Sequence, residues 1–119
     1  MVMDLHKLRK IPGTVKIFDK YLETSKNEAV IYNKEFDKDS FVFRLTVKTG
    51  MVTGVYPRTM LAIKSKTGRY KYRKVQPFSK MASKYARFSV PKGHSLELTF
   101  LADNEGVLRD ANITLELKS

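Results

Sequence analysis

Residues 60–75 read MLAIKSKTGRYKYRKV, two alternating runs on either side of Thr67-Gly68. This pattern predicts a β-hairpin with a two-residue loop. The loop would set the register, with Lys66 opposite Arg69 and Lys64 opposite Lys71. One face of the hairpin would then be basic and the other apolar and aromatic. The basic face would consist of Lys64, Lys66, Arg69, Lys71 and Arg73, and the opposite face of Leu61, Ile63, Tyr70 and Tyr72.

Like charges that lie directly opposite each other destabilise a sheet by roughly 0.2–1 kcal/mol per pair, so an anionic ligand would stabilise this hairpin. Residues on one face of a strand repeat about every 7 Å, a spacing suited to the successive phosphates of an extended polyanion. The alternative is an edge hairpin whose lysines only prevent strand-to-strand aggregation. The distribution of charge in the rest of the chain favours the ligand.

The 119-residue chain has a net charge of +11, concentrated in its middle. Residues 41–92 contain thirteen Lys and Arg and no Asp or Glu, whereas residues 1–40 are nearly balanced and residues 93–119 are acidic. A block of one sign within a folded region indicates a polyanionic partner such as nucleic acid. Acidic proteins, anionic lipids and heparin-like sugars fit the same charge.

The length fits a single domain over residues 1–119, with a possible arm or short helix over 1–13 and a β core over 14–119. The chain has no cysteine, which excludes disulfides, thiolate metal ligands and cysteine nucleophiles. No stretch is apolar enough for a signal peptide or a membrane span. We therefore expect an intracellular, cytoplasmic protein that does not bind membranes.

Alternating patterns predict further strands over residues 14–18, 28–32, 41–48, 51–56, 87–90, 95–100 and 112–117. Thr49-Gly50 would join 41–48 and 51–56 in a second hairpin. In the strand over 41–48, the pattern predicts a buried face made of Phe41, Phe43, Leu45 and Val47.

Residues 77–84 are predicted to form a short helix that begins at a proline. Their apolar residues have helical spacing, at Phe78, Met81, Ala82 and Tyr85. The predicted fold class is mainly β: an antiparallel β-sandwich or partly open barrel of about eight strands with one or two short helices.

Sequence motifs give little support to catalysis. The chain has no P-loop, dinucleotide fingerprint, nucleophile elbow or zinc-protease motif. Glu35, Asp37 and Asp39 alternate and could together hold Mg²⁺ or Ca²⁺, but Lys34 and Lys38 interrupt them, which favours a solvated loop. We therefore expect no enzyme activity, no metal and no cofactor. A metal-dependent nuclease that uses these three carboxylates is the weakest hypothesis.

We predict non-enzymatic nucleic-acid binding through the basic hairpin surface, favouring single-stranded DNA or RNA with little sequence preference, because no recognition helix is predicted. Tyr70 and Tyr72 would point away from the lysines, which favours phosphate contacts over base stacking. The alternative is a structural or assembly module, such as a capsid-like subunit or a binder of an acidic protein, that could form a homo-oligomer. The candidate nucleic-acid-binding residues are Arg44, Lys48, Arg58, Lys64, Lys66, Arg69, Lys71, Arg73, Lys84 and Arg87.

Overall fold

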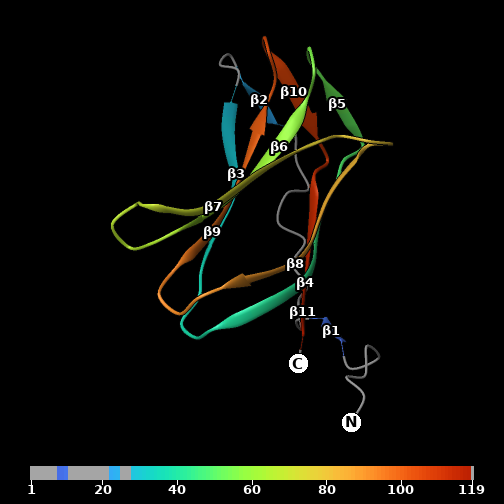
Figure 1. The fold of residues 1–119 in the computed structure, drawn as a ribbon. Helices are drawn as coiled ribbons and strands as arrows, with labels where there is room; N and C mark the ends of the chain where they lie inside the picture. The colour runs from blue at the N-terminus through green and yellow to red at the C-terminus, as the bar shows by residue number, and fades with distance from the viewer. Residues whose placement is uncertain (1–7, 11–21, 25–27, 119) are drawn as a thin grey trace.

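A computed structural model describes residues 8–10, 22–24 and 28–118, which form eleven β-strands and no helix (Figure 1). The predicted strand over 14–18 lies outside these residues. Leu8–Lys10, predicted to belong to an arm or helix, instead form a strand that pairs with the last strand of the chain. The strands are β1 (Leu8–Lys10), β2 (Leu22–Thr24), β3 (Glu28–Glu35), β4 (Ser40–Lys48), β5 (Met51–Thr53), β6 (Arg58–Lys64), β7 (Tyr70–Pro77), β8 (Ala82–Val90), β9 (Ser95–Leu101), β10 (Gly106–Arg109) and β11 (Asn112–Lys118).

Eight of the strands form two antiparallel sheets, in the orders β1-β11-β4-β8 and β3-β9-β6-β7. The pairs are nested along the chain: β6 pairs with β7, β4 with β8, β3 with β9 and β1 with β11. This nesting is the jelly-roll form of a β-sandwich, which confirms the predicted sandwich. A third sheet, β2-β10-β5, lies at one end (Figure 1). Among the described strands β7 and β8 each end a sheet, so the sandwich does not close into a barrel.

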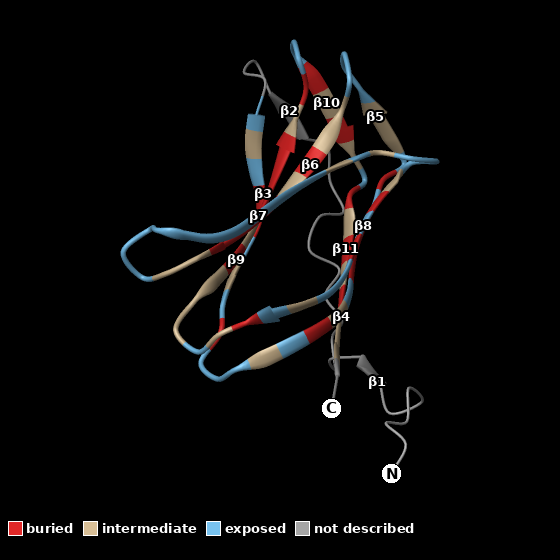
Figure 2. Cartoon of the chain, viewed as in Figure 1, coloured by how far each residue is buried: buried red, intermediate tan, exposed pale blue. Residues whose placement is uncertain are grey.

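The core lies between the two large sheets, where most of the inward side chains are buried (Figure 2). β9 has a neighbour on each side and contributes Leu96, Leu98 and Phe100, all at 0% exposure. β7 is an edge strand, and six of its eight residues in a row, from Tyr70 to Val75, are exposed. Burial of a large apolar side chain stabilises a protein by about 1.5–3 kcal/mol. The central strands therefore stabilise the fold, while β7 contributes little to it.

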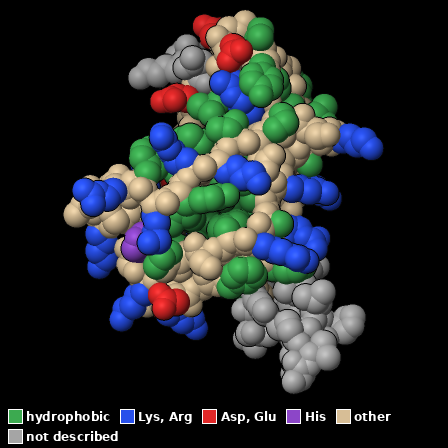
Figure 3. All heavy atoms as spheres, in the orientation of Figure 1, with side chains coloured by type: hydrophobic (Ala, Val, Ile, Leu, Met, Phe, Trp, Pro, Cys, Tyr) green, Lys and Arg blue, Asp and Glu red, His purple; other side chains and the backbone are tan. Residues whose placement is uncertain are grey.

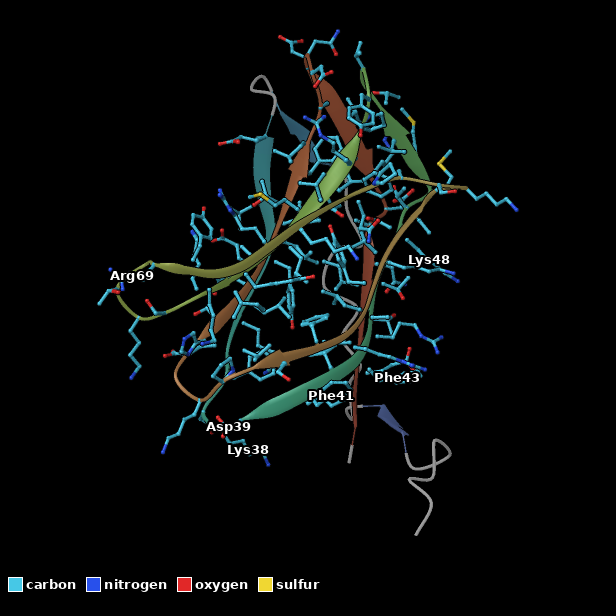
Figure 4. The ribbon with its side chains drawn as sticks, viewed as in Figure 1. Lys38, Asp39, Phe41, Phe43, Lys48 and Arg69 are labelled. Carbon is cyan, nitrogen blue, oxygen red and sulfur yellow. The ribbon has the colours of Figure 1, made fainter. Side chains whose placement is uncertain are left out.

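β4 has a different buried face from the one predicted. Val42 is fully buried, whereas Phe41 lies on the outside and Phe43 is half-buried (Figure 4). Relative to β11, β4 has one extra residue between Val42 and Arg44. This β-bulge shifts the alternation by one residue, so that Val42 takes the inward position expected for its aromatic neighbours.

Residues 77–84 do not form the predicted helix. Ser79 and Ala82 exchange two backbone hydrogen bonds, with N···O distances of 2.7 and 3.1 Å, around Lys80 and Met81. Both central residues have positive φ, 53° and 62°, which defines a type I′ turn between β7 and β8. Spacings of three and four between apolar residues are therefore not specific to a helix. Here they arise because the chain reverses direction between Phe78 and Ala82.

β5 does not form the predicted hairpin with β4. It pairs with β10, with Val52 opposite Leu108, while β4 lies between β8 and β11. Both edges of β4 are thus occupied by longer strands that extend the buried sheet. The short β5 joins the end sheet instead.

Candidate nucleic-acid interface

The β6–β7 loop has three residues rather than the predicted two. The amide of Ser65 donates to the carbonyl of Arg69 at 2.9 Å, and the amide of Gly68 donates to the carbonyl of Ser65 at 2.9 Å. Gly68 has a φ of +85°, the left-handed conformation that closes such a loop. Ser65 therefore faces Arg69, and the predicted Lys66–Arg69 pair is wrong.

A second irregularity lies just below this loop. Ile63 pairs with Tyr72 as predicted, but Lys64 pairs with Tyr70, which leaves Lys71 as an extra residue. The predicted Lys64–Lys71 pair therefore does not form. This bulge also places Tyr70 opposite Lys64, so the two tyrosines do not share a face.

Lys64 is neutralised by a residue from another strand. Its Nζ lies 3.1 Å from Oε1 of Glu97 on β9, and this hydrogen bond raises the pKa of Lys64. The Tyr70 ring lies close to two cations, with its centroid 5.0 Å from Lys64 Nζ and 4.5 Å from Arg73 Cζ. Tyr70 thus packs against the basic side chains that it was predicted to avoid.

Two further candidate cations have carboxylate partners. Arg58 Nη1 lies 3.1 Å from Asp103 Oδ1, and Arg44 Nε lies 3.6 Å from Glu116 Oε2. Exposed pairs of this kind contribute about 0–1 kcal/mol to stability, but they reduce the charge available to a ligand. These residues and Lys64 are therefore the weakest candidates.

The remaining candidates are exposed and form no ion pair within the described part of the chain. Lys and Arg side chains follow β7 and β8, while Asp and Glu lie toward the two ends of the same face (Figure 3). Arg69 lies at the tip of the β6–β7 hairpin, and Lys48 lies near the opposite end of β7 (Figure 4). These exposed candidates are Lys48, Lys66, Arg69, Lys71, Arg73, Lys84 and Arg87.

A hollow of about 500 Å³ lies beside the type I′ turn. Three lysines from three segments line it: Lys48 ends β4, Lys80 lies in the turn and Lys84 lies on β8. No carboxylate belongs to the lining. The lining residues are Lys48, Gln76, Pro77, Ser79, Lys80, Ala82 and Lys84.

Buried hydroxyl groups join the two sheets next to this turn. The Tyr85 hydroxyl on β8 donates to the Thr59 carbonyl on β6 at 2.8 Å, and the Thr59 and Ser83 hydroxyls are hydrogen-bonded. All three residues are at most 2% exposed, and burial raises the pKa of Tyr85. This cluster holds the start of β8 against β6 and so positions the hollow.

The acidic residues of the 35–39 segment are not gathered around one point in the structure. Asp39 Oδ1 accepts a hydrogen bond from the Lys92 amide at 2.7 Å, while Glu35 and Asp37 line a hollow of about 400 Å³ together with Lys66 and Lys92. Within the described residues, no group of three acidic or histidine side chains could hold a metal ion. The nuclease hypothesis therefore has no structural support.

The comparisons with known proteins reveal a fold likeness only. No protein family and no curated protein matches the sequence. A chain of the infectious bursal disease virus VP2 subviral particle matches with a TM-score of 0.53 and 8% identity, over 87% of this chain and 31% of the viral one. A chain from the infectious bursal disease virus Gx strain matches with a TM-score of 0.51 and 7% identity, over 88% and 32%. The present chain thus spans about a third of these chains and is similar to them in fold.

Two residues of the basic surface are not among the predicted candidates. These are Lys74 on β7 and Lys80 in the type I′ turn, and both are exposed. Both belong to the one-sign block over residues 41–92, the one signal that could have found them. The described part of the chain also has no helix that could span a membrane.

Proposed function

We propose that the chain is a non-enzymatic protein that binds single-stranded nucleic acid through its phosphates. The phosphates would lie along β7 and β8, the consecutive edge strands of the two large sheets, which we call the β7–β8 edge. One observation carries this proposal: the edge exposes cations from Arg69 to Arg87 with no carboxylate among them in sequence and no ion pair to a described carboxylate. Such a surface repels itself in the free protein. Binding of a polyanion would remove that repulsion.

The shape of the edge favours an extended single strand over a duplex. An exposed β-strand presents same-face side chains about every 7 Å, which suits a strand of phosphates. The described residues include no helix that could enter a major groove. Tyr72 is 41% exposed on β7 and offers a ring on which a base could stack. Contacts of this kind give little sequence preference.

The test is a salt-titrated binding assay with single-stranded DNA, duplex DNA, RNA and heparin. Each phosphate contact on a single strand should add about −0.7 to the slope of log affinity against log salt, so five contacts predict roughly −3 to −4. Single strands of different sequence should bind alike and more tightly than the duplex. Affinity that does not depend on salt would contradict the proposal.

An assembly module is the second candidate, and the fold likeness favours it. The two similar chains come from a virus and a subviral particle. In this function the basic edge would bind nucleic acid within an assembly of many copies. Light scattering would test it, since addition of single-stranded DNA should raise the molar mass well beyond one bound copy.

A further inference from the structure

We propose that the hollow beside the type I′ turn is a binding site for one phosphate group, held by Lys48, Lys80 and Lys84. The proposal deepens the proposed function, and rests on it only for the source of that phosphate. The group could belong to a nucleic-acid strand or to free phosphate. Both present negatively charged oxygens on a tetrahedral phosphorus to the lysines.

The strand register brings two of these lysines together. Lys48 pairs with Ala82 and Thr46 pairs with Lys84, so Lys48 and Lys84 are diagonal neighbours on adjacent strands. Diagonal neighbours on one face lie about 7–8 Å apart, within reach of long side chains. Two lysines on residues this close repel each other, and neither has an ion pair with a described carboxylate. An anion between them would reverse the repulsion.

The third lysine is held in an unusual backbone conformation. Lys80 and Met81 both have positive φ, where glycine or asparagine is usual. The turn is fixed from outside by the Thr49 amide, which donates to the Met81 carbonyl at 3.0 Å. Left-handed non-glycine residues persist where the surroundings hold them, and they cluster at ligand sites. Here the conformation places Lys80 in the lining of the hollow.

The other donors identify the ligand class. Gln76 and Ser79 add an amide and a hydroxyl to three ammonium groups, and the lining has no acidic side chain. A ligand must therefore offer several acceptor oxygens and negative charge, as phosphate does. The volume of about 500 Å³ exceeds that of one phosphate, so the sugar and base attached to it can also fit.

The test compares two triple variants with equal loss of charge. The first is Lys48→Gln/Lys80→Gln/Lys84→Gln, and the control is Lys66→Gln/Arg69→Gln/Lys71→Gln at the other end of β7. All six side chains are exposed, so both variants should unfold at the same temperature as the wild type. Anisotropy with labelled single-stranded DNA measures affinity. Pyrophosphate competition and NMR titration with inorganic phosphate measure binding at the hollow.

The first variant should lose about tenfold more affinity for DNA than the control. Inorganic phosphate should shift the amide signals of residues 79–82 in the wild type and the control but not in the first variant. Equal loss of affinity in both variants without a phosphate-induced shift would overturn this site and leave the proposed function standing. A shift in a protein that binds no nucleic acid would support the site and overturn the proposed function.

Discussion

The loops at the two ends of β7 both need left-handed backbone, but they place different residues there. The β6–β7 loop uses Gly68, with a φ of +85°, whereas the β7–β8 turn uses Lys80 and Met81. No atom lies within 4 Å of the position that a Cβ would occupy at Gly68, so this loop is open and relaxed.

The two ends of β7 also differ in whether their lysines lie near carboxylates. At the β6–β7 end, Lys64 pairs with Glu97, and Lys66 shares a hollow with Glu35 and Asp37. At the β7–β8 end, three lysines share a hollow without a carboxylate. Left-handed non-glycine residues and a hollow without a carboxylate therefore occur together at the end where we place the phosphate.

The largest effect on stability is expected from the buried hydroxyl cluster next to the β7–β8 turn. Tyr85→Phe removes a buried hydroxyl that bonds to Thr59, and should lower the free energy of unfolding by about 1–3 kcal/mol. Tyr72→Phe is the matched control, since this ring is 41% exposed and the loss should stay within about 0.5 kcal/mol. Urea unfolding measures both. Equal losses would mean that the cluster does not anchor β8.

The two loops should respond to glycine in opposite directions. Gly68→Ala should destabilise the protein by about 1 kcal/mol, because a Cβ is unfavourable at this φ. Met81→Gly should stabilise it by about 0.5–1 kcal/mol, because the strain in the turn is relieved. Thermal and urea unfolding would show the two signs. Loss of stability in Met81→Gly would mean that the turn is not strained.

Much of the sandwich is readable from local alternation. The predicted strands over 28–32, 41–48, 95–100 and 112–117 lie within β3, β4, β9 and β11, and the hairpin over 60–75 is formed by β6 and β7. Alternation does not reveal bulges, because an inserted residue leaves the composition of a strand unchanged. The bulges at Phe43 and Lys71 therefore changed which side chains share a face.

The helix over 77–84 was predicted wrongly for a related reason. Ser83 is a polar residue within this segment, yet it is buried against Thr59, a residue twenty-four positions earlier. Such a contact has no local signal. The charge of the site was visible in the sequence, whereas the pairing of its cations was not, since Glu97, Asp103 and Glu116 come from distant segments.

The smallest effect is expected from a substitution that makes the two ends of β7 more alike in charge. Glu97→Gln removes the partner of Lys64, so the relaxed end would gain one uncompensated cation. The pair is partly exposed, so stability should fall by no more than about 1 kcal/mol. Affinity for single-stranded DNA should rise, and the salt slope should steepen by about 0.7, because Lys64 can now contact a phosphate. The matched control is Glu116→Gln, which releases Arg44 on the other sheet with the same change in net charge. If both variants bind DNA equally tightly, net charge alone sets the affinity, and β7 has no special place in the interface.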